Sequence, residues 1–498
     1  MTQLLACPSA VLAVDQGTSS TKAVLVDRSG RVLGRASVAV SRSDPQPGWV
    51  EQSAGEIRDS VIQAMTTIMQ DADVDVVGVG LSNQRESAVI WSRETGEPLG
   101  PMLGWQDRRT AGRAVQLQRR GVEQEVRRRT GLPLDPTFSA LKIEWLLDQV
   151  DPSRELSRAG RIAVGTVDSW ILHCLSGEHR IETGNASRTQ LLDIQTAQWD
   201  PFLLDLFNVP MECLPSVESS DEPSKPILVV PGLEGVCVTA VLGDSHAALY
   251  AHGARVPGQV KATYGSGGSV MGLSSGFRAQ VKDSGLVRTI AWSTPKPVYA
   301  FEGTALSVGS TLVWLSKLLG VDMAQLAELG ATGREGLDFV PAFAGLGAPY
   351  WDESAVALFS GLGLGSTAAD LARAAFESIA LQTESLLHAA EEDESIHIDT
   401  MLVDGGPTQN DWLMQLQADL SQRLVMRSNV AELSAMGVAH LAGVATGLWS
   451  SEECLDLPRD RSPFRPQLRK ELADSRWNRW EASVERARFR PSRSDNNS

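Results

Sequence analysis

The sequence lacks the marks of several large classes of protein. Its five cysteines are scattered and form no CxxC pair, which excludes a zinc-finger spacing and favours a reducing compartment. No apolar run reaches the roughly 18 residues that span a bilayer, and no basic segment followed by an apolar core marks a secretory signal. The net charge of −16 disfavours nucleic acid and anionic membranes as partners. We therefore expect a cytoplasmic protein that binds neither.

Motifs of several common enzyme classes are also missing. The chain has no Gly-Lys dipeptide, which excludes a Walker A loop, and it contains neither HExxH nor GxGxxG. Residues 272–276 match the GxSxG pattern of hydrolases, with Ser274 at the centre. This segment does not lie at a clear strand-to-helix elbow, so we expect a chance match. A hydrolase that uses Ser274 stays as a separate hypothesis.

The order of predicted elements in the first half of the chain repeats in the second half. Apolar runs at 11–14 and 22–26 flank a polar turn, which predicts a β-hairpin, and 259–263 with 269–272 predicts another. Further strands are expected at 31–40, 76–81 and 400–403, and helices at 56–69 and 370–389. With 498 residues, the chain is long enough for two like α/β domains with a cleft between them.

The turn that follows the first strand carries the first candidate site. Asp15 ends the strand, and the next residues include one glycine, four hydroxyl side chains and Lys22. Backbone N–H groups and hydroxyls in a tight turn can bind a phosphate chain, and an aspartate at a strand end can hold a metal. An ordinary polar hairpin explains the same residues equally well.

A second aspartate follows another apolar strand. The apolar strand over 236–244 ends in Gly243-Asp244-Ser245-His246, so Asp244 can project into a cleft and accept a proton from a substrate hydroxyl. The structural alternative is a helix N-cap, because Asp244 precedes a helical run at 247–251.

Three further turns have weaker signals. Residues 263–269 repeat the Gly/Ser/Thr chemistry of the first turn, and residues 404–407 contain paired glycines that let a flat ligand approach the backbone. Arg85 and Glu86 offer a forked donor beside a carboxylate acceptor, which suits neighbouring hydroxyl groups. Plain turns and a surface ion pair are the respective alternatives.

Together these segments resemble the FGGY carbohydrate kinases, and among them most closely the glycerol kinases. The resemblance runs from about residue 11 to about residue 449. Residues 357–377 look like the second signature of the family and 138–149 like most of its first. The other matching segments are 15–20, 47–51, 82–86, 105–110, 165–170, 183–188, 263–267, 341–352 and 403–406.

The resemblance implies two actin-like, ribonuclease-H-like domains, at 1–253 and 254–498, that close over ATP and Mg²⁺. It implies a kinase for a small polyol or sugar, with Asp244 as the base and with Asp15 and Asp244 beside the metal. It also leaves a homodimer or a homotetramer open. The residues implied for the substrate are Arg85, Glu86, Thr137, Asp244 and Ser245, and those for the nucleotide are Thr18, Ser19, Ser20, Lys22, Ser266, Gly309, Gly406 and Asn410.

The chain departs from the glycerol kinases in the pocket for the acceptor. Thr137 replaces a tyrosine, Ser245 a glutamine and Ser269 a phenylalanine, so the pocket should be wider and more polar. We expect a longer substrate, such as a four- or five-carbon polyol or a ketopentose, with glycerol as the alternative. Pro407 and Val313 also depart from the family pattern at the adenosine site. A non-catalytic nucleotide-binding sensor is the remaining hypothesis.

Overall fold

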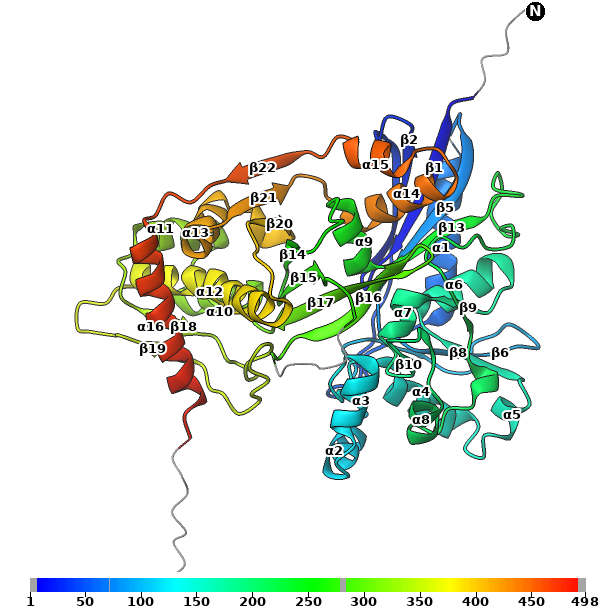
Figure 1. The fold of residues 1–498 in the computed structure, drawn as a ribbon, viewed down its shortest axis with the longest axis horizontal. Coiled ribbons are helices and arrows are strands. Elements are labelled where there is room, and N and C mark those ends of the chain that lie inside the picture. Colours follow the sequence, from blue (N-terminus) through cyan, green and yellow to red (C-terminus); the bar gives the residue numbers. More distant parts are fainter. Residues whose placement is uncertain (1–6, 71, 278–283, 491–498) are drawn as a thin grey trace, which may run out of the picture.

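The computed structural model describes residues 7–70, 72–277 and 284–490, and it contains two large β-sheets (Figure 1). In the first sheet, β1 pairs antiparallel with β2 and parallel with β5, which confirms the first predicted hairpin and places Asp15 opposite Lys22. The strands in order across this sheet are β13 (Val238–Gly243), β5 (Asp75–Asn83), β1 (Ser9–Gln16), β2 (Ser20–Asp27) and β3 (Val32–Ala39).

The second sheet has the same core topology with strands added at both edges. Here β14 pairs antiparallel with β15 and parallel with β20, as β1 does with β2 and β5. The internal repeat inferred from the sequence is therefore present in the strand order. The seven strands in order are β16 (Val287–Ser293), β17 (Pro297–Ala305), β15 (Gly268–Leu273), β14 (Gln259–Tyr264), β20 (Thr400–Asp404), β21 (Leu424–Ser428) and β22 (Arg461–Phe464).

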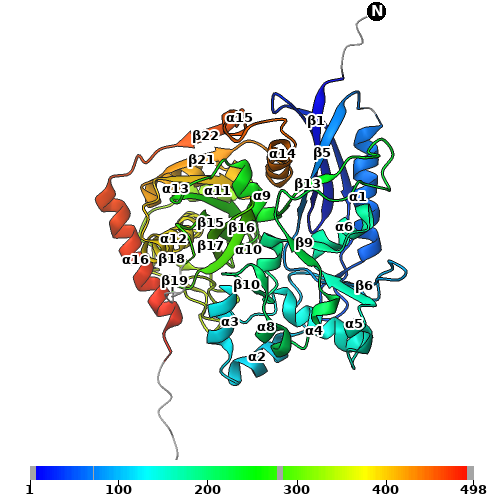
Figure 2. The same ribbon diagram turned by 45° about the vertical axis from the view of Figure 1, so that its right-hand side comes forward.

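Two apolar helices, α9 (Asp244–Ala251) and α14 (Leu433–Ala445), fill the space between the sheets (Figure 2). They pack with their backbones in close contact, because a Cβ atom on Gly437 would lie 1.9 Å from the carbonyl oxygen of Ala247. Helix α14 also packs on β1, β5 and β13, although it follows the strands of the second sheet. Both helices begin at the cleft between the sheets.

The outer faces of the sheets are covered by longer amphipathic helices. The helix predicted at 56–69 is α1 (Ala54–Met69), which packs on β2 and β3, and the one predicted at 370–389 is the longer α12 (Ala368–Glu394), which packs on β15 and β17. No helix of the described residues is long and apolar enough to cross a membrane. The other long helices are α6 (Val167–Ser176), α10 (Gly309–Leu319), α11 (Met323–Thr332), α13 (Asp411–Ser421) and α16 (Lys470–Arg488).

A smaller helical region lies below the first sheet in the view of Figure 2. Its core is separate from those of the two sheets and includes residues of β6 and β8. This region supplies Thr137, which lies just before α4, and Arg188, which follows α7. Its main elements are α2 (Ala111–Arg119), α3 (Glu123–Thr130), α4 (Ser139–Val150), α7 (Thr183–Ser187), α8 (Pro201–Leu206), β6 (Val89–Ser92) and β8 (Ile162–Gly165).

Candidate active site

A cavity of about 450 Å³ lies where the two sheets face each other. Asp15 at the end of β1, Lys261 on β14 and Asp404 at the end of β20 line it, and the beginnings of α9 and α14 complete its wall. The carboxyl ends of parallel strands are where ligands bind in open α/β sheets. Four of the five segments singled out in the sequence reach this lining, through Asp15, the Asp244–Ser245 pair, Thr263 and the turn at 404–406. The fifth, Arg85 with Glu86, does not.

Asp15 is held by the strand next to it. The hydroxyl of Ser82 on β5 donates to its carboxylate over 2.8 Å. Burial raises the pKa of Asp15 to about 6, and the neighbouring charge of Asp244 adds to this rise. Asp15 and Asp244 therefore face the same cavity and disfavour each other's ionisation. Across the described chain, no group of three or more His, Cys, Asp or Glu side chains is arranged to hold a metal on its own.

Asp244 occupies the first position of α9 rather than its N-cap. The N-cap is Gly243, so the structural alternative from the sequence is wrong by one residue. The backbone N–H of Ser245 donates to the Asp244 carboxylate over 2.6 Å, and 41% of the side-chain surface stays exposed to the cavity. Burial raises the pKa of Asp244, although the nearby Arg85 guanidinium opposes that rise. A carboxylate with a raised pKa is better suited to accept a proton.

Arg85 and Glu86 belong to a buried ionic network, not to a surface ion pair. The Arg85 guanidinium donates to Asp244 over 3.1 Å and to both oxygens of Glu302 over 3.1 and 2.8 Å. Arg188 lies 3.0 Å from Glu302 and donates to Glu86 over 2.6 Å. All four side chains of this Arg85–Glu302–Arg188–Glu86 network are at least nine-tenths buried.

The roles of Glu302 and Arg188 in this network were not predicted from the sequence. Glu302 lies on β17 in an otherwise apolar stretch, and an isolated acid in a buried strand is a signal that could have been followed. Arg188 lies in a segment that matched the family but received no role. A further missed residue is Lys261, the one lysine or arginine among the described residues that line the cavity.

Thr137 and Ser269 border the same network from two directions. The backbone carbonyls of Thr137 and Glu86 both accept hydrogen bonds from the ammonium group of Lys142. Ser269 on β15 pairs with Thr304 on β17, two residues from Glu302. Alternate residues on a strand share a face, so Ser269 and Glu302 point to the same side of the sheet. The structure thus places Arg85 and Ser245 in hydrogen-bond contact with Asp244, and it links Thr137 to Glu86 through Lys142.

The first predicted phosphate turn lies between β1 and β2, but its residues do not line the cavity. The Thr18 hydroxyl accepts a hydrogen bond from the indole of Trp105 over 3.2 Å, Ser19 is exposed and Ser20 begins β2. Lys22 lies opposite Asp15 in the hairpin. The turn is therefore beside the Asp15 end of the cavity rather than inside it.

The residues predicted for the other end of the nucleotide form a second group. The amide of Gly309 donates to the carbonyl of Gly265 over 2.9 Å, and a Cβ atom at Gly309 would lie 2.6 Å from that oxygen and 3.4 Å from Pro407. Exposed Ser266 and the Gly406 turn therefore adjoin Gly309. The side chain of Asn410 is used differently. It caps helix α13 by accepting a hydrogen bond from the amide of Leu413 over 3.0 Å.

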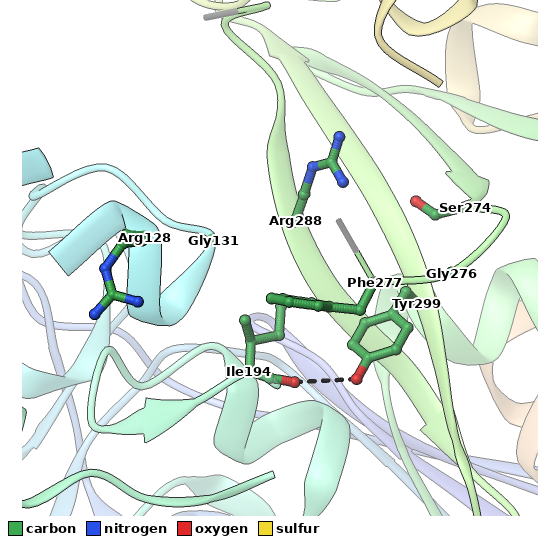
Figure 3. A pocket seen from close by; sticks show the side chains of 8 residues that line it. All are labelled: Arg128, Gly131, Ile194, Ser274, Gly276, Phe277, Arg288 and Tyr299. Atoms are coloured by element: carbon green, nitrogen blue, oxygen red, sulfur yellow. Dashed lines mark hydrogen bonds between the residues drawn. The ribbon is translucent and has the colours of Figure 1, made fainter. Parts of the chain in front are cut away.

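The GxSxG match lies in a different part of the molecule. Ser274 lines a cavity of about 10 Å³ between the end of α3 and strands β15 to β17, with Arg288 and Tyr299 beside it (Figure 3). A space of that size holds about one water molecule. The Ser274 hydroxyl is buried and has no hydrogen-bond partner among the described residues. This serine is not activated by a base, which favours the interpretation as a chance match.

The fold and the cleft define a class of protein. Two sheets of the same topology, with paired aspartates and two polar turns around the cavity between them, form the two-domain α/β architecture of actin-like phosphotransferases. Family models agree, since the FGGY family of carbohydrate kinases matches with its N-terminal domain over residues 10–251 and its C-terminal domain over 260–446. The chain belongs to the FGGY family of carbohydrate kinases, and it is an ATP-dependent kinase for a sugar or polyol.

Individual relatives support the same conclusion. The chain is 41% identical to an apulose kinase of Pectobacterium atrosepticum over 97% of its length and 99% of the relative, and 40% identical to a glycerol kinase of Xanthomonas campestris over 95% and 97%. It superimposes on Plasmodium falciparum glycerol kinase with ADP at a TM-score of 0.91, with 27% identity over 97% of this chain and 99% of that one. A xylulose kinase of Lactobacillus acidophilus, at 20% identity and a TM-score of 0.87 over 96% and 98%, shares the fold.

Proposed function

We propose that the protein transfers the γ-phosphoryl group of ATP to a terminal hydroxyl of a four- or five-carbon polyol or ketose. The observation that carries this proposal is the position of Asp244. Its carboxylate lines the large cavity together with Asp15, and it also accepts a hydrogen bond from Arg85, the first member of the buried ionic network. Asp244 therefore lies between the cavity proposed for the nucleotide and the network proposed to bind the acceptor hydroxyls, where it can contact both substrates.

In the proposed reaction, Asp244 accepts the proton of the acceptor hydroxyl as its oxygen bonds to the γ-phosphorus. The bond from that phosphorus to the bridging oxygen of ADP breaks on the opposite side. The amide of Ser245 and the guanidinium of Arg85 fix the orientation of the Asp244 carboxylate. Burial keeps the pKa of this carboxyl above its ordinary value, which strengthens it as a base.

Mg²⁺ fits the pair formed by Asp15 and Asp244. This ion is usually bound through one or two carboxylates together with substrate phosphates. Asp404 and Glu432 also line the cavity, but no three His, Cys, Asp or Glu side chains of the described residues are arranged to hold a metal by themselves. When bound there, Mg²⁺ would neutralise charge on the phosphate oxygens. Its positive charge would also offset the Asp244 charge, which adds to the rise that burial causes in the pKa of Asp15.

For the nucleotide, the proposal uses the turns on both sides of the cavity. Thr18, Ser19, Ser20 and Lys22 would bind the β- and γ-phosphates from the first sheet, because they border the Asp15 end. From the second sheet, Ser266 would contact the terminal phosphates. The residues proposed to frame the adenosine are Gly309, Gly406 and Asn410.

The acceptor would bind over Arg85 and Glu86, with Thr137, Ser245 and Ser269 around it. These three hydroxyl residues are half-buried and small, which favours an acceptor longer than glycerol. The named relatives include both an apulose kinase and glycerol kinases at almost equal identity. Glycerol is accordingly the second candidate for the acceptor.

A coupled ADP-release screen tests the acceptor directly. The panel would contain glycerol, apulose, erythritol, pentitols, ribulose and xylulose, with the phosphorylated product identified by mass spectrometry. We expect kcat/KM for at least one four- or five-carbon acceptor to exceed that for glycerol tenfold or more. A preference for glycerol over every longer acceptor would overturn this choice of substrate, and no turnover with any of them would overturn the kinase proposal for this panel.

We further propose a cytoplasmic location and assembly as a homodimer or homotetramer. The scattered cysteines support a reducing compartment, because all five are free thiols in the described structure. Multi-angle light scattering at several protein concentrations would measure the assembly, and a monomer at every concentration would contradict it.

A further inference from the structure

Lys142 on α4 is a buried amine without a nearby carboxylate partner. Its side chain is fully buried, and its ammonium group donates to three backbone carbonyls. These belong to Glu86 at 3.3 Å, Phe138 at 3.4 Å and Thr137 at a shorter distance. Among the ion pairs of the described residues, none includes Lys142, so its charge is balanced by carbonyl dipoles alone within bonding distance.

Burying an amine in this way is costly. Removal from water lowers the pKa of Lys142 to about 7, while the more distant carboxylates of Glu86, Asp107 and Asp135 oppose that fall and Arg108 adds to it. An ordinary packing role would be filled at lower cost by methionine or leucine. We therefore take the hydrogen bonds to the three carbonyls as the reason for a lysine at this position.

One of those carbonyls belongs to a strained residue. Glu86 has a φ of +63°, in the left-handed region that non-glycine residues rarely adopt. Its carbonyl accepts a second hydrogen bond, from the hydroxyl of Ser139 over 3.0 Å. This conformation sends the Glu86 carboxylate to Arg188, while the preceding residue Arg85 reaches Glu302 and Asp244. The backbone conformation at Glu86 must be kept if Arg85 and Glu86 are to reach these different partners.

We propose that Lys142 is a positioning residue for the acceptor, which locks the strained Arg85–Glu86 turn and sets its separation from the Thr137 loop. One ammonium group bonds to both segments, so the distance between them is fixed by a single atom. These segments are the two sides of the acceptor pocket under the proposed function, on which this inference rests. Lys142 itself does not touch the reacting atoms.

The test compares Lys142→Met with Arg154→Met. Arg154 is also a buried cation of this region that donates to backbone carbonyls, including those of Asp151 and Asn208, but it is absent from the acceptor network. We expect Lys142→Met to raise the acceptor KM at least tenfold with the ATP KM within twofold of wild type, and Arg154→Met to leave both unchanged. An unchanged acceptor KM in folded Lys142→Met, or an equal rise in both KM values, would overturn the proposal.

Two additions keep the test decisive. If Lys142→Met does not fold, Ser139→Ala removes the other donor to the Glu86 carbonyl, and we expect at least a threefold rise in the acceptor KM; no rise would count against the proposal. Amide hydrogen exchange needs no substrate: peptides covering 84–90 and 135–141 should exchange faster in Lys142→Met than in Arg154→Met. Equal exchange would refute the positioning role, whereas an inactive wild type would refute only the proposed function.

Discussion

The guanidinium of Arg85 joins Asp244 to Glu302, with Nε 3.1 Å from the first carboxylate and its two terminal nitrogens 3.1 and 2.8 Å from the second. Asp244 begins a helix between the sheets, whereas Glu302 lies on a strand of the second sheet. A single arginine from the first sheet thus connects the proposed base to the other half of the molecule. The position of this arginine depends on Glu302.

Removing the charge of Glu302 should weaken acceptor binding and should also lower the stability of the fold. Glu302→Gln leaves Arg85 and Arg188 buried with less compensation, so we expect a loss of about 3 kcal/mol in unfolding free energy and at least a tenfold rise in the acceptor KM. Urea unfolding and steady-state kinetics measure both. The matched control is Glu377→Gln, a buried carboxylate 2.8 Å from Arg373 on α12, which should lose stability without changing the acceptor KM. Equal acceptor KM values in the two variants would contradict the prediction.

Adding a methyl group at Gly309 should weaken nucleotide binding without changing acceptor binding. The new Cβ of Gly309→Ala would lie 2.6 Å from the carbonyl oxygen of Gly265 and would push the second turn out of place. We expect the ATP KM to rise at least fivefold, with the acceptor KM within twofold. Gly112→Ala on α2 is the control, because nothing lies within 4 Å of its Cβ, and alanine should be neutral or slightly stabilising there. A normal ATP KM in Gly309→Ala would argue against an adenosine site at this turn.

Larger side chains in the acceptor pocket should shift the substrate preference toward shorter acceptors. Ser245→Gln combined with Ser269→Phe introduces the larger side chains that the resemblance to glycerol kinases implies for these positions, so the pocket should become shorter. We expect the ratio of kcat/KM for glycerol to that for the preferred longer acceptor to rise at least tenfold. The same screen measures both substrates. A ratio unchanged by the double substitution would show that these two serines do not set acceptor length.

The stability of the protein should fall as pH rises through the neutral range because of Glu182. Burial raises the pKa of this carboxyl to about 7, so its stabilising contribution is complete below its unfolded pKa near 4.5 and is lost as pH rises through 7. The loss is on the order of 3 kcal/mol. Urea unfolding at pH 5 and pH 7 should show a flatter dependence for Glu182→Gln than for wild type or for exposed Glu94→Gln. Parallel dependences in all three proteins would refute this assignment.

Local signals in the sequence were sufficient for the hairpins, several helices and the internal repeat, whereas the actin-like architecture followed from the family resemblance. Apolar runs around polar turns predicted both hairpins, and helical spacing predicted α1 and α12, because these patterns depend on neighbours a few residues apart. Asp244 was also identified as the end of a buried strand. Its assignment as an alternative N-cap was wrong by one residue, which is within the usual uncertainty of helix boundaries.

Contacts between distant residues could not be predicted in the same way. Arg85 and Glu302 are 217 positions apart, and only the packing of the two sheets brings them together. Lys261, which nothing in the sequence singled out, is the one lysine or arginine of the described residues that lines the cavity, whereas the role expected of Lys22 at the phosphates stays a prediction. Lys142 gives no sign in the sequence that it is buried or that it bonds to carbonyls of two separate segments. Such contacts depend on the tertiary structure.

The rate of phosphorylated-product formation by Asp244→Asn, measured beside its ATP affinity, tests the central claim most directly. The amide keeps the size of the side chain but cannot accept the hydroxyl proton, so we predict a fall of about 10²- to 10⁴-fold in kcat with ATP affinity within threefold of wild type. Asp193→Asn is the control, since Asp193 lies in a surface turn, where it accepts from the backbone amides of Gln195 and Thr196 and from the Thr196 hydroxyl. Retention of more than a tenth of the wild-type rate by Asp244→Asn would contradict its role as the base.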